Sequence, residues 1–269
     1  MKEEKNEMSF LGHLEELRWH LVRSAAAIFI IGILLFVFQK EVFNHFLLAH
    51  RKSDFITYQI FCDFFNLFGM DSTFCNVAFT DNLISLKPTQ QLMTAIWSSM
   101  ILGIILAFPY LLWELWRFIS PGLTKKEVKS SRGFLFVASF LFFCGIAFSF
   151  YVIAPISIHF LYNYKISDVI QNNFTLESHI GLVTNMLLGV SVLFELPVLV
   201  YFLTKIGLVT PEFLKKYRKH SLVVVLILAA IITPPDVASQ IIVAIPILVL
   251  YEISIKVSRM VIKKQKKDA

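Results

Sequence analysis

Residues 180–203 read IGLVTNMLLGVSVLFELPVLVYFL, and Glu195 is their only charged residue. An α-helix rises about 1.5 Å per residue, so a helix of this length spans the roughly 30 Å hydrocarbon core of a bilayer. Three other stretches are similarly apolar, and we predict four long transmembrane helices at about 21–39, 92–114, 133–155 and 180–204. The chain is therefore expected to be an all-α polytopic membrane protein.

The composition of the 269 residues supports this fold class. Hydrophobic residues make up 57% of the chain and charged residues 16%, whereas an ordinary soluble protein has about 25% charged residues. So few charges cannot cover the surface of a soluble domain, so lipid must be the solvent for much of the chain. We expect a single membrane domain and no binding to nucleic acid, despite the net charge of +6.

Two shorter apolar stretches follow at about 221–234 and 239–256, and Thr233-Pro234-Pro235-Asp236 joins them. Each could be a re-entrant segment, but the charges on either side require an even number of crossings. We therefore predict two short spans that meet at a tight turn, and six transmembrane helices in total.

Lysine and arginine are distributed unevenly among the segments that join these spans. Four lie before or at the start of the first span, five between spans two and three, five between spans four and five, and six from Lys256 through the tail 257–269, whereas five lie on the opposite side. Because cytoplasmic loops carry an excess of these residues, both termini are expected in the cytoplasm. Residues 1–20 are expected to form an amphipathic cytoplasmic helix before the first span.

The external segment 40–91 is too rich in aromatic residues for a disordered linker. We expect it to fold as short helices over the outer end of the bundle. Cys62 and Cys75 lie in this segment, on the oxidising side of the membrane. We predict a disulfide between them, with two unpaired buried thiols as the alternative.

The sequence carries no motif of a known catalytic or metal centre. It has no phosphate-binding loop, no dinucleotide fingerprint and no His-Glu-x-x-His pair, and its seven histidines have no metal-ligand spacing. We therefore expect neither an enzyme nor a bound cofactor or metal. A transporter or a protein-binding membrane scaffold remains.

Glu195 is the sharpest polar feature, because a carboxyl group inside a span carries a substantial insertion penalty. Pro197 has no backbone N–H and clashes with the carbonyl of Leu193, so the helix should bend beside the acid. Glu195 is either protonated and hydrogen-bonded to backbone groups freed by that bend, or part of a polar pocket that faces a cavity or a partner.

The turn between the two short spans is also polar. Asp236 could simply cap the helix that follows it. Together with Thr233 and Gln240, it could instead form a polar patch at the outer end of these spans.

Acidic residues also lie at the basic cytoplasmic face. Glu15 and Arg18 are one helical turn apart, as are Glu16 and His20, so surface ion pairs are the simplest interpretation. Glu127 lies among three lysines, where solvated pairing is again expected.

Four motifs together resemble the TatC family, whose members are the core subunit of the twin-arginine protein translocase. They are HLEELR at 13–18, FISPGLTKKE at 118–127, FELP at 194–197 and TPPDVASQ at 233–240. They occur in the family's order across nearly the whole chain. The resemblance implies a glove-shaped bundle of six helices, with a short fifth and sixth helix, in the cytoplasmic (inner) membrane of a bacterium.

The resemblance also implies a receptor for paired-arginine signal peptides on folded precursor proteins. Two guanidinium groups call for carboxylates in bidentate geometry, and Glu16 and Glu127 match the acids that the family uses. Other positions of that surface are matched by Arg18, Phe118, Pro121 and Leu123.

The same resemblance implies partners within the membrane. They are the single-span TatA-type and TatB-type proteins, with the proton-motive force as the energy source, and further copies of this chain in a homo-oligomer. Glu195 would hydrogen-bond a polar side chain of a TatA-type helix. Thr233 and Gln240 match a polar cluster where TatB-type helices dock.

The main alternative is a secondary transporter or channel subunit for a small solute. Such a protein would need broken helices around a site at the membrane midplane, and usually inverted repeats. Only one acid is expected at midplane, and no repeat is visible. The chain departs from the TatC pattern in 40–91, which is longer and more aromatic, so no residue is carried over from that segment.

Overall fold

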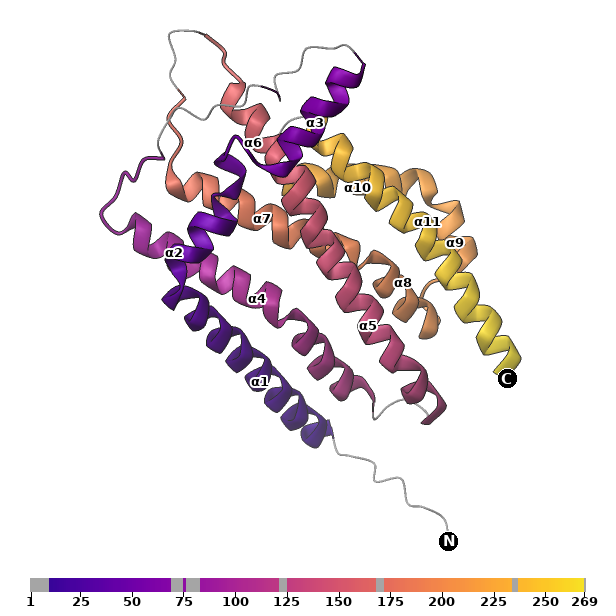
Figure 1. Ribbon diagram of the computed structural model, residues 1–269. Coiled ribbons are helices and arrows are strands. Elements are labelled where there is room, and N and C mark those ends of the chain that lie inside the picture. Colours follow the sequence, from indigo (N-terminus) through magenta and orange to yellow (C-terminus); the bar gives the residue numbers. More distant parts are fainter. Residues whose placement is uncertain are drawn as a thin grey trace.

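The computed structural model describes residues 10–68, 75, 83–120, 125–167, 172–233 and 237–268. Among these residues, five helical segments are long and apolar enough to cross a membrane. They form a bundle in which the start of α1 (Phe10–Val37) and the end of α11 (Val237–Asp268) lie toward the same end (Figure 1). The chain is therefore a helical, multi-pass membrane protein, as its apolar stretches predicted.

The other three long segments are α4 (Gln90–Ile119), α5 (Lys125–Phe148) and α7 (Leu176–Phe194) with their extensions. α5 continues through the π-helical turn η5 (Ser149–Ile153) into α6 (Ala154–Asn163). α7 is followed directly by α8 (Leu196–Lys205). α7 packs against both α4 and α5 and is the most buried of the five, whereas α1 packs almost entirely against α4.

The fifth predicted span is a short helix, α10 (Arg218–Ile232), which packs against α11 and follows the single-turn helix α9 (Pro211–Lys216). Its 15 residues give a length of about 22 Å, less than the thickness of the hydrocarbon core. Five long helices are thus found in the described part of the chain, and a sixth crossing remains a prediction.

The prediction of a short last helix is wrong. α11 has 32 residues and continues through the basic segment that the sequence suggested was a tail. Val257, Met260 and Val261 recur at helical spacing in that segment and line a shared surface with α8, so the helix has an apolar face to bury. The amphipathic helix predicted for residues 1–20 is not separate either, because from residue 10 onward it is the first part of α1.

Glycines allow the closest approaches between helices. A Cβ atom at Gly103 would lie 3.0 Å from the carbonyl oxygen of Ile28, so α1 and α4 meet there backbone to backbone. A Cβ atom at Gly145 would lie only 2.7 Å from the Cα atom of Ser191, which brings α5 against α7. Small residues at such crossings are typical of helix packing in membranes.

The predicted bend beside Glu195 is confirmed. α7 ends at Phe194, Glu195 has a φ of −77° and a ψ of −1°, and α8 begins at Leu196. Pro197 is the second residue of α8 and has no N–H to donate to the carbonyl of Leu193, so the hydrogen-bond ladder is interrupted here. Below this break α8 packs against α11, whereas α5 packs mainly against α7.

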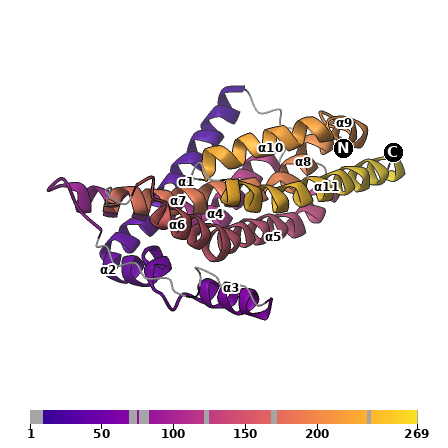
Figure 2. The same cartoon turned by 90° about the horizontal axis from the view of Figure 1, so that it is seen from above.

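Short helices fold over one end of the bundle, as predicted for 40–91: α2 (Gln39–Val42), η1 (Phe43–Leu47), η2 (Ala49–Arg51) and α3 (Ile56–Leu67). Seen from above, α2 and α3 lie to one side of the long helices (Figure 2). The buried His50 ring donates from Nε2 to the carbonyl oxygen of Phe150 at 2.8 Å, and burial lowers the pKa of His50 to about 4. Tyr58 donates to the carbonyl oxygen of His50 at 2.8 Å, so this segment is fixed to η5.

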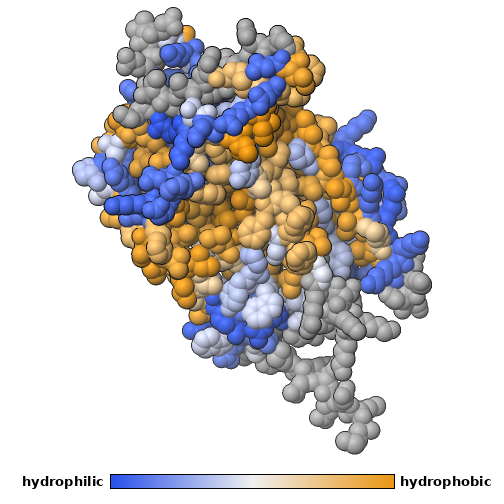
Figure 3. All heavy atoms as spheres, viewed as in Figure 1, coloured by the Kyte–Doolittle hydropathy of each residue, from blue (hydrophilic) through white to orange (hydrophobic). Residues whose placement is uncertain are grey.

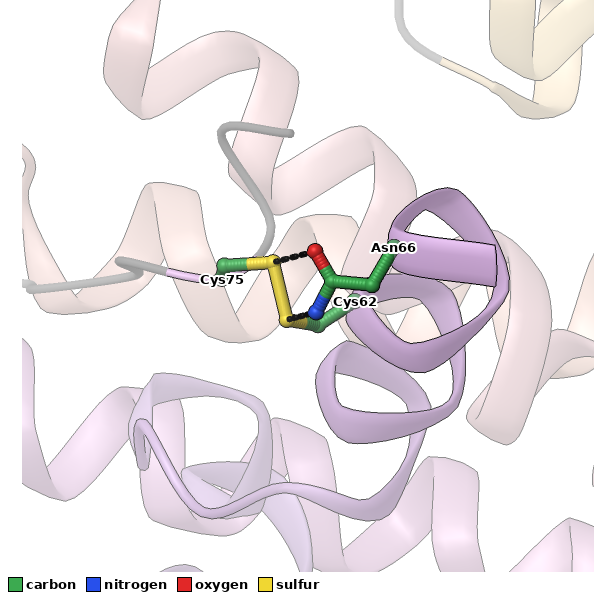
Figure 4. Close-up of a disulfide and its surroundings, with 3 residues drawn as sticks. All are labelled: Cys62, Asn66 and Cys75. Carbon is green, nitrogen blue, oxygen red and sulfur yellow. Dashed lines mark hydrogen bonds between the residues drawn. A yellow bond between two sulfur atoms is a disulfide. The ribbon is translucent and has the colours of Figure 1, made fainter. Parts of the chain in front are cut away.

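Cys62, on α3, and Cys75 are joined by a disulfide, the pairing that the sequence predicted (Figure 4). Asn66, one turn along α3, places its amide nitrogen 3.4 Å from the Cys62 sulfur. Cys144 is a free, half-buried thiol inside α5.

A thiol-labelling experiment tests this pairing. In the purified protein unfolded in dodecyl sulfate, a maleimide reagent is expected to label one cysteine without reductant and all three after reduction, because a disulfide-bonded sulfur does not alkylate. The measurement is the mass of the labelled protein. With the disulfide in place, a Cys144→Ser variant should take up no label before reduction and two labels after it. Three labels on the wild type without reductant would contradict the pairing.

The surface has the distribution that a bilayer requires. Hydrophobic residues cover the middle of the face in Figure 3, and hydrophilic residues gather toward its margins. Many large apolar side chains of α1 face outward, among them Ile30, Ile33 and Val37, which are all more than 60% exposed. Lipid is the natural environment for this surface.

Candidate functional site

A buried polar cluster connects α1 to α4 near the end of the bundle where α1 begins. Its centre is Glu114, whose side chain is 1% exposed although it lies in a long apolar helix. His20 on α1 contacts one carboxylate oxygen through Nδ1, and Arg23 places its Nε atom 3.4 Å from the same oxygen. Tyr110 donates to the other oxygen at 2.9 Å. The acid is therefore buried and almost fully paired, although the side chain of Arg23 is 42% exposed.

Arg117 completes this cluster from the outside. Its guanidinium lies 3.8 Å from the Glu114 carboxylate and 4.9 Å from the centre of the Trp113 ring, where it makes a cation–π contact. Glu114 thus compensates the positive charge of two arginines and contacts His20 at the junction of α1 and α4. A carboxylate in this role leaves fewer free cations at the face that a positively charged ligand would approach.

The expected ion pair between Glu16 and His20 is wrong, because His20 contacts Glu114 instead. Oε2 of Glu16 is buried and has no hydrogen-bond partner among the described residues. Arg18 is exposed, two residues further along α1. Phe118, in the last turn of α4, packs edge-on against the His20 ring with a centroid distance of 6.0 Å. Glu16, His20 and Phe118 therefore lie at one end of the α1–α4 pair.

Three other predicted residues of this face lie wholly or partly outside the described part of the chain. Pro121 and Leu123 lie outside the described residues, and Glu127 lies in the first turn of α5, but its side chain is outside the described part. α5 and α4 are nevertheless neighbours in the bundle. Glu127 lies at the start of α5, the next helix after α4 in the chain, and so at the end of α4 that carries Phe118.

Glu195 lies at the break between α7 and α8. Both carboxylate oxygens are buried, and neither has a partner of hydrogen-bond geometry among the described residues, although the backbone of Phe142 on α5 lies nearby. Two alternatives were predicted for Glu195. The first, hydrogen bonds from the carboxyl to backbone groups freed by the bend, does not match this geometry, because neither oxygen has such a partner among the described residues. An acid without a partner is a candidate contact for a polar group supplied from outside the chain.

The predicted patch on the last two helices is only partly described. Thr233 is buried and donates to the carbonyl oxygen of Ala229 at 2.9 Å, within α10. Gln240 donates from Nε2 to the carbonyl oxygen of Leu226 at 3.0 Å and so connects α11 to α10. Asp236 lies outside the described residues. Gln240 therefore serves the α10–α11 contact, whereas Thr233 closes the last turn of α10, and no direct contact between the two side chains is seen.

No group of three or more potential metal ligands occurs in the described ranges. Pro197 and Val198, which follow Glu195 closely in the chain, line an apolar groove. A more polar cavity of about 490 Å³ lies between the first halves of α4 and α7, where the amide of Gln90 donates to Glu177 at 3.2 Å.

The sequence did not single out Glu114. The available signal was an acid in an apolar, aromatic-rich run, but Glu114 is the last residue of the predicted second span, where a charge is common. Its partners His20 and Arg23 lie more than 90 positions away, so only the folded helix pair identifies the cluster.

Comparison with known proteins gives consistent matches. Residues 12–246 match the family model described as Sec-independent protein translocase protein (TatC). The chain is 40% identical to a Sec-independent protein translocase protein TatC from Blattabacterium sp. subsp. Periplaneta americana (strain BPLAN), over 98% of this chain and 100% of that protein. It is 38% identical to the TatC protein of Helicobacter pylori (strain J99 / ATCC 700824), over 93% of this chain and 88% of that protein.

Solved structures show the same fold. A crystal structure of the twin arginine translocase receptor TatC superposes with a TM-score of 0.67 at 30% identity and covers 93% of this chain and 99% of its own. A second crystal structure of that receptor, in the detergent DDM, gives a TM-score of 0.69 at 31% identity, with coverages of 90% and 97%.

Proposed function

Because this chain belongs to the TatC family of Sec-independent protein translocase proteins, we propose that it is the receptor for signal peptides with paired arginines. It takes part in a bacterial twin-arginine translocase as a multi-pass membrane protein. In our proposal both termini lie in the cytoplasm, the chain assembles with TatA-type and TatB-type single-span proteins and with further copies of itself, and the proton-motive force drives transport.

One observation carries the proposed binding role: a buried carboxylate oxygen of Glu16 has no partner among the described residues. A guanidinium group supplies two parallel N–H donors and fits such a carboxylate in bidentate geometry. Glu16 is not required by the nearby basic side chains, because His20, Arg23 and Arg117 already surround Glu114. Glu127 is the second acid of the proposed site, and the ring of Phe118 supplies an apolar surface beside it.

Binding of a synthetic signal peptide tests this proposal. Wild-type protein in detergent should bind an Arg-Arg peptide more tightly than the matched Lys-Lys peptide, because lysine cannot form the bidentate contact. Glu16→Gln is expected to weaken Arg-Arg binding about 10- to 100-fold, since a hydrogen bond to a charged group contributes about 1.5–3 kcal/mol. Isothermal titration measures the dissociation constants.

Glu15→Gln is the matched control, because Glu15 is the adjacent acid on α1 and is exposed. It removes the same charge and should change binding less than threefold. Glu127→Gln tests the second acid in the same way. Equal binding of both peptides, or equal effects of the Glu15 and Glu16 variants, would exclude a specific arginine site at Glu16.

The intramembrane polar residues are proposed to serve the partners. The unpaired carboxyl of Glu195 is positioned to form a hydrogen bond, as donor or acceptor, with a polar side chain of a TatA-type helix. Thr233, Asp236 and Gln240 are proposed to form the surface for a TatB-type helix. The alternative of a small-solute transporter gains no support, because every similarity above is to a translocase protein.

A further inference from the structure

An apolar groove of about 310 Å³ opens between α5, α8 and α11. Its walls include Val137 and Leu141 of α5, Tyr201 of α8 and Met260 of α11, and Lys264 lies among the lining residues. Val137 and Met260 are 49% and 63% exposed, so the groove is open to the surroundings of the bundle. Inside a membrane those surroundings are lipid.

The groove is a consequence of the break at Glu195. Above the break α7 packs closely against α5 through Gly145, but below it α8 packs against α11. Pro197 and Val198, the first residues after the break, line the groove. The space between α5 and α8 is therefore not filled by side chains of the described residues. At Gly133, a further lining residue, an added Cβ atom would meet nothing within 4 Å.

The groove runs toward the most basic part of the chain. α11 has 32 residues and so a length of about 48 Å, which exceeds the hydrocarbon core by several turns. Its last part carries six basic residues, and Lys264 is the one that lines the groove. A groove between membrane helices that is lined by a lysine at its basic end has the chemistry to bind an anionic lipid headgroup.

We propose that this groove is a binding site for one anionic phospholipid. An acyl chain lies against Val137, Leu141 and Met260, and the headgroup phosphate contacts the ammonium group of Lys264. A phospholipid fits better than a free anion, because the walls are apolar, and the basic end of α11 selects the negative charge. This inference does not depend on the proposed receptor function.

Native mass spectrometry of the delipidated protein tests the proposal with phosphatidylglycerol and phosphatidylcholine that carry identical acyl chains. The first bound molecule of phosphatidylglycerol is expected to bind about fivefold more tightly than the first molecule of phosphatidylcholine. This is the preference expected from one lysine beside a headgroup of net negative charge. Lys264→Gln should remove most of this preference. Lys263→Gln, at the adjacent exposed position that does not line the groove, should leave it unchanged. Millimolar inorganic phosphate should not displace the lipid.

A second pair of variants tests the apolar part. Gly133→Leu should fill the groove and weaken binding of both lipids several-fold. Gly181→Leu should not weaken binding, because Gly181 also has open space around it but lines the separate cavity between α4 and α7. Both changes favour the helix, so folding is expected to be retained. Equal effects of the Lys263 and Lys264 variants, or no effect of Gly133→Leu, would overturn the proposal. A change of oligomeric state in Gly133→Leu without loss of lipid would show that another protein helix covers the groove, and would also overturn it.

Discussion

Glu114→Ala is expected to lower the free energy of unfolding by about 1–3 kcal/mol, because it leaves the buried His20 ring without its partner, whereas Arg23 and Arg117 are nearly half exposed and stay solvated. Two arginines, one histidine and Tyr110 surround the Glu114 carboxylate, which is 1% exposed. His20 and Arg23 belong to α1, so the loss should act on the contact between α1 and α4. Unfolding in dodecyl sulfate, followed by circular dichroism, measures the change.

An exposed ion pair provides the control for this prediction. Arg218 and Glu252 also join two helices, with 2.7 Å between their charged atoms, but both side chains are half exposed. Glu252→Ala should therefore change stability by less than about 1 kcal/mol. Glu114→Gln, which keeps the volume and a hydrogen-bond acceptor, should have an intermediate effect. If Glu114→Ala proves as mild as Glu252→Ala, the cluster does not hold α1 to α4.

Gly145→Leu should destabilise the bundle by about 3 kcal/mol, the upper end of the usual range for overpacking. Even a Cβ atom would lie 2.7 Å from the Cα atom of Ser191 and 3.0 Å from the Cβ atom of Phe194. The first of these neighbours is backbone and cannot rotate away, so α5 and α7 must separate there. The midpoint of thermal unfolding in detergent is the measurement.

Gly133→Leu is the matched control on the same helix, since a Cβ atom at Gly133 meets nothing within 4 Å. This variant should be as stable as the wild type, or slightly more stable because leucine favours helix over glycine. Equal stability of the two variants would mean that α5 and α7 do not approach each other as closely as described.

Local sequence signals predicted much of the fold. Long apolar runs predicted the long helices. Pro197, two residues after Glu195, predicted the break between α7 and α8, because a missing backbone donor acts locally. The cysteines in the aromatic segment gave the disulfide. The extent of α11 was missed, since its basic residues suggested a solvated tail, whereas Val257, Met260 and Val261 supply an apolar face.

The polar contacts were harder to predict, because they depend on which helix faces which. His20 could pair with Glu16 on its own helix or with an acid elsewhere, and only the packing of α1 on α4 decides for Glu114. Gln240 was predicted as part of a docking surface, yet its amide donates to α10. The motif resemblance selected Glu16 and Phe118 as candidate residues without any such knowledge, and their role remains a proposal.

The pairing of α1 with α4 has a consequence for biosynthesis. His20, Arg23, Tyr110, Glu114 and Arg117 all belong to the first 117 residues of the chain. At a translation rate of about 5–20 residues per second, the remaining part of the chain takes roughly 10–30 s to synthesise. α1 and α4 can therefore pair in the membrane and form their charge cluster before α7, the most buried helix, has been synthesised. The later helices then pack against an α1–α4 pair that is already formed.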